Sequence, residues 1–206
     1  MAYTRGSSSN IIVGAAALFT YEAGTLTDAD LPAYVEDEAF TTTLSADVDF
    51  RNVGYTMNGL EIVFQPDFGE VQVDQVLDVA KLYKQGMQVN LNTAFAESTL
   101  ENLLYSLAGK STDLTTVAGN KEMNLSAGDI GEVPLERGLV AVGPGSGAAG
   151  AGIERVYVAY RALSIENVTV SAKRDESTMF EVSFRLLPND SASYGKIVDR
   201  TVNQVS

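Results

Sequence analysis

The chain has 206 residues, of which 45% are hydrophobic and 20% are charged, and its formal net charge is −13. This length is enough for one domain with a full hydrophobic core. The absence of His and Cys excludes disulfides, the common zinc ligands, and catalytic dyads or triads built on either residue. The excess of carboxylates argues against a nucleic-acid-binding protein, because duplex affinity depends on Lys and Arg.

The N-terminal quarter is expected to contain one strand between two irregular segments. Residues 1–10 are small and polar and predict an N-terminal arm, whereas the apolar run 11–21 predicts a strand. The acidic stretch 25–50, broken by Pro32, predicts a long loop, although 40–50 would also suit a hairpin. No run of the sequence is long and apolar enough to span a membrane.

Apolar and polar residues alternate three times between residues 60 and 95. This pattern predicts strands at 60–65, 70–74 and 87–95, each with one buried and one solvated face, and a connection at 66–69. The dipeptide Asn58-Gly59 before them predicts a turn with positive φ. The solvated face carries no Lys or Arg and is rich in carboxylates and amides. Its candidate residues are Glu61, Gln65, Glu70, Gln72, Asp74, Gln88, Asn90 and Asn92.

One short helix is predicted at about 98–108. Ser98, Thr99, Leu100 and Glu101 match a capping box, and Gly109 suits a left-handed stop. Its apolar side chains recur at helical spacing, which indicates that one face lies on a sheet. The residues expected to make this packing are Leu100, Leu103, Leu104 and Leu107.

The second half of the chain predicts further antiparallel strands. A polar connector at 110–133 precedes strands at 137–142 and 154–162, which are joined by a Gly-rich hairpin tip at 143–152. A last hairpin is predicted from 165–173 and 178–187, followed by a C-terminal arm at 189–206. The fold class is therefore mainly β: a single domain, residues 1–206, forming an antiparallel sandwich or barrel with one short flanking helix.

No motif points to a cofactor, a metal ion or catalysis. Gly145, Gly147 and Gly150 have the spacing of a dinucleotide-binding loop, but a strand-like sequence follows where the phosphate-binding helix is required. The aspartates have no calcium-loop spacing, and the carboxylates lack the aromatic and apolar surroundings of a glycosidase site. We therefore expect no cofactor, no metal and no enzymatic activity.

The order of these segments resembles that of the major tail tube proteins of long-tailed, non-contractile bacteriophages. The resemblance covers about residues 10–195 and is strongest at 53–107, which includes VGYTMNGLEIVFQPDFGEVQVDQV, and at 155–196, which ends in FEVSFRLLPNDSASYGKI. It implies a β-sandwich protomer, six copies of which close a ring around a continuous inner barrel. Rings would stack through loops and terminal arms, here residues 1–10, 25–50, 143–152 and 189–206.

The resemblance also implies partners and a location. The chain would assemble with itself in the host cytoplasm, contact tape-measure, tail-terminator and baseplate proteins, and reside in the virion tail without a membrane. DNA would pass through the lumen without tight binding. The polar face of residues 61–92 would line this lumen, since carboxylates and amides repel or release phosphates. The alternative is that this face lies on the outside of the tube.

Two other functions remain open from the sequence. An immunoglobulin-like binding or adhesion module of a virion or cell surface would be a stable monomer with a discrete pocket or aromatic patch. A carboxylate enzyme would carry a concave site with a Glu of raised pKa. A tube protein would instead polymerise.

Overall fold

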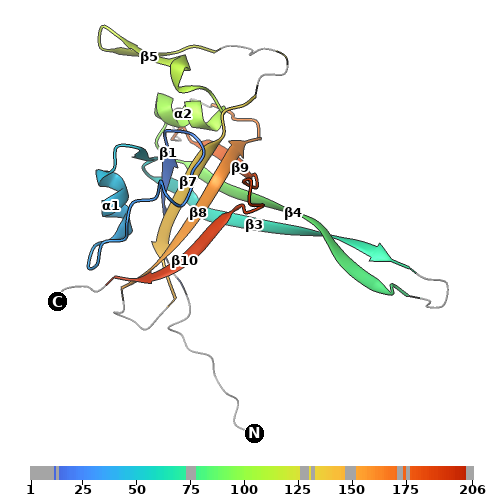
Figure 1. Ribbon diagram of the computed structural model, residues 1–206. Coiled ribbons are helices and arrows are strands. Elements are labelled where there is room, and N and C mark those ends of the chain that lie inside the picture. The colour runs from blue at the N-terminus through green and yellow to red at the C-terminus, as the bar shows by residue number, and fades with distance from the viewer. Residues whose placement is uncertain are drawn as a thin grey trace.

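The computed structural model describes residues 12, 14–72, 78–125, 130, 133–146, 152–170, 174 and 177–202. Within these residues the protein is mainly β, as predicted, and its strands form antiparallel sheets (Figure 1). The main sheet folds over on itself into a sandwich. One layer contains β2 (Phe50–Asn52), β1 (Ala17–Tyr21), β7 (Arg137–Pro144), β8 (Ile153–Ser164) and β10 (Gly195–Thr201). The other contains β9 (Phe180–Leu186), β4 (Lys81–Phe95) and β3 (Thr56–Val71).

Strand β8 joins the two layers. One of its edges pairs with β7, while the other edge is divided between two partners. Residues Ile153 to Ala159 pair with β10, and residues Ala162 to Ser164 pair with β9. The strand order is therefore β2-β1-β7-β8-β9-β4-β3, with β10 as a branch on β8. The main core lies between the diverging layers and includes Leu91, Phe95 and Phe184 facing Leu18 and Leu139.

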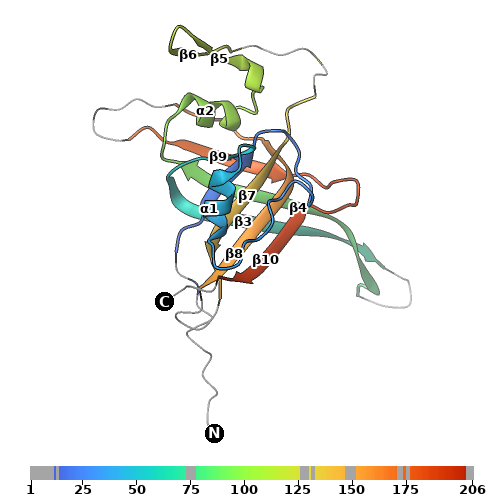
Figure 2. The same cartoon turned by 60° about the vertical axis from the view of Figure 1, so that its left-hand side comes forward.

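A second apolar cluster covers the outer face of β1, β7 and β8. Helix α1 (Phe40–Ala46) lies over this face and buries Phe40 and Leu44 completely (Figure 2). The prediction of a loop or hairpin for this segment was wrong. The Thr-rich helix has no side-chain cap of its own. Instead, the carboxylate of Glu154 on β8 accepts a hydrogen bond from the Phe40 backbone N–H at 3.1 Å.

The one helix that the sequence predicted, at about 98–108, exists as α2 (Leu100–Ser106), with Thr99 rather than Ser98 as its N-cap. The Thr99 hydroxyl accepts a hydrogen bond from the Asn102 N–H at 3.2 Å. Of the predicted packing residues, Leu104 is buried and Leu103 and Leu100 are partly buried, but Leu107 is 46% exposed. The structure buries three polar or aromatic residues of the helix that the sequence analysis did not include: Asn102, Tyr105 and Ser106.

The end of α2 also differs from the prediction. The left-handed residue is Ala108, with a φ of 53°, and not Gly109. Gly109 is instead a position of close approach, because a Cβ there would lie 2.6 Å from Leu104 Cδ1. The helix therefore stops without the glycine geometry that the motif predicted.

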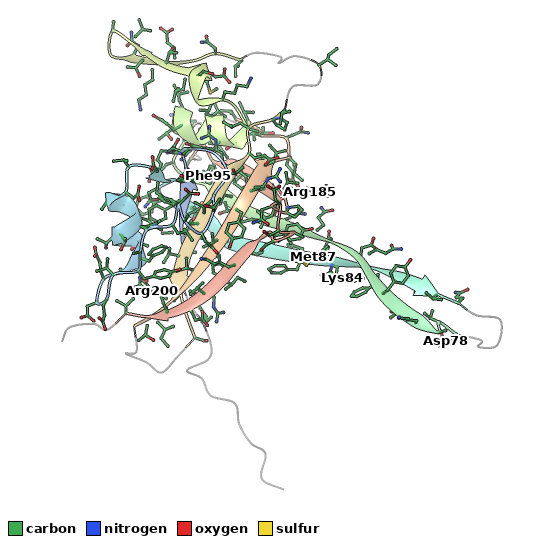
Figure 3. The ribbon with its side chains drawn as sticks, in the orientation of Figure 1. Asp78, Lys84, Met87, Phe95, Arg185 and Arg200 are labelled. Carbon is green, nitrogen blue, oxygen red and sulfur yellow. The ribbon has the colours of Figure 1, made fainter. Side chains whose placement is uncertain are left out.

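Strands β3 and β4 form a long hairpin that projects beyond the sandwich, which we call the arm (Figures 1 and 3). The predicted connection at 66–69 does not exist, because β3 is continuous from Thr56 to Val71. Asn58 and Gly59 do have positive φ values, 65° and 71°, as predicted. They form a bulge within β3 rather than a turn between strands.

Several other boundaries differ from the sequence prediction. The predicted connector contains a short hairpin above α2, formed by β5 (Leu114–Val117) and β6 (Asn120–Met123) and preceded by a 3₁₀ turn (Ser111–Asp113). Residues 165–170 do not form the predicted strand, and β10 occupies part of the predicted C-terminal arm. The N-terminal arm at 1–10, residues 147–151 of the predicted hairpin tip at 143–152, and residues 203–206 lie outside the described residues, while β7 extends into the start of that tip.

Candidate assembly surfaces

One face of the arm is polar along its inner half. Residues directly opposite in an antiparallel pair share a face, and the register places Glu61 opposite Asn92 and Gln65 opposite Gln88. The Asn92 amide donates a hydrogen bond to Glu61 Oε2 at 3.2 Å. This face, which we call the polar face, gathers five of the predicted candidates: Glu61, Gln65, Gln88, Asn90 and Asn92.

The other predicted candidates do not join this face. Because β3 continues without a break, Glu70 lies an odd number of residues from Gln65 and points to the opposite side. Its partner in the register is Leu82. The prediction of one shared face was wrong for Glu70, since it assumed a separate strand there. Gln72 follows the end of β3 and is exposed, and Asp74 lies outside the described residues.

The neighbouring strand β9 adds residues that the sequence analysis did not assign to this surface. The register places Arg185 beside Asn90 and Ser183 beside Asn92, and Ser183 Oγ donates to Asn92 Oδ1 at 2.7 Å. The prediction that this surface carries no Lys or Arg was therefore wrong, because Arg185 is exposed on it. A polar groove of about 290 Å³ beside it contains three carboxylates, those of Glu61, Glu166 and Glu181.

The opposite face of the arm is mainly apolar, although Glu70 and Lys84 also lie on it. Near the body, Val89 and Leu91 on this face belong to the sandwich core, but Phe64 is 53% exposed. An apolar cleft of about 360 Å³ runs between this face and strands β8 and β10, and Tyr157 and Ile197 line its far side. A further hollow of about 310 Å³ shares Ile62, Phe64 and Tyr157 with it, so the cleft continues beneath the arm. We call this feature the apolar cleft.

The outer half of the arm has no third strand paired with it in the described part of the chain. Strand β4 pairs with β9 only from Val89 onward, so beyond Met87 the two strands of the arm pair only with each other. Figure 3 shows Lys84 and Met87 where the arm leaves the body and Asp78 near its outer end. Phe68 and Leu82 on this ribbon are 54% and 60% exposed. The outer edge of β3 has no partner strand among the described residues.

A partly buried polar cluster beside α2 includes the buried Arg137. The ring of Tyr105 on α2 lies between two guanidinium groups, 4.6 Å from Arg51 and 4.3 Å from Arg137. The Glu22 carboxylate lies within 3.3 Å of Arg51 Nε and 3.6 Å of Arg137 Nη1. Burial, more than any charge, raises the pKa of Tyr105. The adjoining cavity is only about 10 Å³, too small for a substrate.

Neither a metal site nor a membrane-spanning helix is found in the described part of the chain. Within it, no group of three or more His, Cys, Asp or Glu residues is placed to hold a metal ion. No helix among the described residues has the length and apolar character needed to cross a membrane. A comparison with protein-family models found no match for this chain, and a comparison with curated proteins found none either.

Proposed function

We propose that this chain is a structural protein that assembles with itself into stacked rings, as in a phage tail tube, with the polar face of the arm toward the lumen. The observation that carries the proposal is the arm itself. It presents a polar face, an apolar face that the described part of the chain leaves partly uncovered, and an edge of β3 with no partner strand among these residues. A long exposed edge is a template for pairing with another chain.

The chemistry of the polar face supports its place in a lumen. Glu61, Gln65, Asn90 and Asn92 offer carboxylates and amides, and Arg185 is the one cation beside them in the described chain. Carboxylates repel the phosphates of DNA, and neutral amides hold them only weakly. Such a lining would let a duplex pass without binding it, whereas an outward-facing lining would have no such role.

The same features distinguish this proposal from an immunoglobulin-like adhesion module. A module that works as a monomer is expected to cover its apolar faces and to keep its sheet edges short or protected. Here β3 is a 16-residue edge strand, and Phe64, Phe68 and Leu82 are each more than half exposed. These surfaces are what an assembling protomer would bury.

Negative-stain electron microscopy of the purified, concentrated protein tests the proposal. We expect rings of six-fold symmetry or hollow tubes built from them. Filaments without a lumen, or a protein that remains monomeric under all conditions that favour assembly, would contradict it. A monomer would favour the adhesion module, for which binding to cell surfaces would then be measured.

A further inference from the structure

We infer that the outer half of the arm of one copy inserts the side chains of Phe68 and Leu82 into the apolar cleft of a second copy. This inference rests on the proposed self-assembly and specifies the surfaces that make the contact within it. Both surfaces belong to the same chain, one on the projecting ribbon and one between the root of the arm and strands β8 and β10.

The ribbon needs a partner to be stable. A two-stranded hairpin without further support is marginal in water, because it buries too little apolar surface to offset the loss of conformational entropy. The outer arm is such a ribbon, and the apolar side chains on one of its faces are exposed: Phe68 by 54% and Leu82 by 60%. Burial of these side chains against another molecule would supply the missing stabilisation.

The arm cannot fill the cleft of its own copy. Ile62, Phe64 and Met87 at the root of the arm already form one side of that cleft. The ribbon continues outward from them as the same pair of strands, away from β8 and β10 (Figures 1 and 3). The chain's own ribbon is therefore excluded as the occupant, whereas the ribbon of a second copy has matching apolar character and is free to reach the cleft.

Charges on the two surfaces are complementary. Glu70 lies directly opposite Leu82 in the register, so its carboxylate accompanies the apolar side chains of the ribbon. The receiving cleft is lined by two ammonium groups: that of Lys196, and that of Lys84, which lies opposite Phe68 where the ribbon begins and so belongs to both surfaces. Lys196 already pairs with Asp28 at 2.6 Å, whereas Lys84 contacts Met87 Sδ at 3.8 Å and no carboxylate in the described chain. Lys84 of one copy is thus available for Glu70 of the next.

The contact joins two different surfaces, so it is heterologous and propagates from copy to copy until a ring closes. This geometry makes a complementation test possible. Leu82→Asp places a charge on the apolar surface of the ribbon and leaves the cleft unchanged. Ile197→Asp places a charge in the cleft and leaves the ribbon unchanged. Both side chains are more than half exposed, so neither change places a charge in the core. Val117→Asp on β5, where the side chain is 55% exposed, is the matched control.

Sedimentation velocity measures the outcome. We expect wild type and Val117→Asp to form assemblies, each of the other two variants alone to sediment as monomers, and their equimolar mixture to form a one-to-one dimer. Circular dichroism would confirm that all variants are folded. Retained assembly of Leu82→Asp, a mixture that stays monomeric, or a monomeric wild type would overturn the inference.

Electron microscopy separates this inference from the proposed function. Tubes formed by Leu82→Asp would refute the role of the arm and leave the tube proposal intact. A complementing pair of variants, with a wild type that forms assemblies but no rings or tubes, would confirm the contact and refute the tube. Because the natural chain has no Cys, single cysteines at residues 82 and 197 can also be joined selectively by a short bis-maleimide. A cross-link only in the mixture of the two would support the contact.

Discussion

Arg137 is the one charged residue in the buried set of the described chain, and it connects α2 to the sheet. Its guanidinium stacks on Tyr105, donates to the Tyr105 hydroxyl and to the Gly109 carbonyl at 3.3 Å each, and lies beside Glu22. Removal of such a group leaves buried acceptors without a donor, which costs more than the loss of an exposed ion pair.

We therefore expect Arg137→Met to lower the free energy of unfolding by about 2–3 kcal/mol, since it unpairs buried groups. Urea denaturation would measure this loss. The control is Arg155→Met, because Arg155 pairs with Asp199 at the surface and its removal should change stability much less. Equal effects of the two variants would refute the structural role of the buried cluster.

The pH dependence of stability should come mainly from carboxylates in ion pairs. Asp28 accepts hydrogen bonds from Lys196, at 2.6 Å, and from the Tyr160 hydroxyl, at 2.9 Å. The bond from Lys196, followed by that from Tyr160, lowers the pKa of Asp28 below its ordinary value of 3.8. Burial, followed by the bond to Asp28, raises the pKa of Tyr160 to about 12.

A carboxyl whose pKa is lower in the folded state stabilises the fold above its ordinary pKa, and the stabilisation is lost as pH falls through the lowered value. Unfolding free energy should therefore decrease below about pH 4 and stay nearly constant between about pH 5.5 and 7, because the chain has no His. Asp28→Asn should reduce the amount of unfolding free energy that is lost in acid. Asp28 is 64% exposed, so the change at neutral pH should be under about 1 kcal/mol. Unfolding curves at a series of pH values would measure the stability at neutral pH and its loss in acid. If Asp28→Asn loses as much unfolding free energy in acid as the wild type, Asp28 is not a source of the pH dependence.

At the scale of elements, β10 depends on one glycine. Gly195 begins this strand opposite Ala159, and a Cβ at residue 195 would lie 1.9 Å from the Val158 carbonyl oxygen. The obstacle is backbone, which cannot move aside without breaking the pairing of β8 with β10.

Gly195→Ala should therefore detach the first residues of β10 and expose their amides. Hydrogen exchange would show this as faster exchange at residues 195–198, with a lower midpoint of thermal unfolding. Gly86→Ala is the control, because a Cβ at residue 86 would meet nothing within 4 Å. Normal protection of β10 in Gly195→Ala would show that the sheet can adjust at this point.

Sequence patterns predicted the elements whose stability is local. Alternation identified the faces of β4, β9 and the first half of β3, while β7 and β8 were predicted as strands without assigned faces. The capping motif identified the N-cap of α2 to within one residue. They failed where distant residues decide the structure. Helix α1 has no local start signal, and Glu154, more than a hundred residues away, supplies its cap. Pro66 and Gly69 suggested a turn, but both are accommodated in the hairpin arm, with a bulge after Asp67.

Of the two candidate surfaces, the polar face was predicted in part and the apolar cleft was not. Odd and even residues of one strand face opposite sides, but this rule assigns a face only if the strand is known to be continuous. The prediction assumed a break between Gln65 and Glu70, and Glu70 was therefore assigned to the wrong side. The apolar cleft was not predicted at all. It arises because β9 and β10 share one edge of β8 and the layers diverge, and no local pattern records that pairing.

At the scale of the whole molecule, the polar face determines how an assembled tube would treat DNA. Glu61→Lys combined with Gln65→Lys adds three positive charges to that face of each copy. If the face lines the lumen, tubes of this variant assembled in the presence of duplex DNA should retain it, and the enclosed DNA should resist nuclease. Retention should weaken steeply with salt, because it depends on phosphate contacts.

The matched control places the same three charges elsewhere. Thr116→Lys combined with Glu122→Lys alters the exposed β5–β6 hairpin, which stands apart from the arm (Figure 2). DNA bound by this variant should be digested by nuclease. Digestion of the DNA held by the polar-face variant as well would show that the polar face lies on the outside of the tube.

The divided edge of β8 also has a consequence for synthesis. Both strands that complete this edge, β9 and β10, follow β8 in the chain, and the pairing with β10 extends to Thr201. A growing polypeptide that ends before these strands therefore lacks one wall of the apolar cleft. Since neighbouring ribosomes on one messenger produce many partial copies at close range, late completion of the cleft would keep nascent chains from joining one another before each has folded.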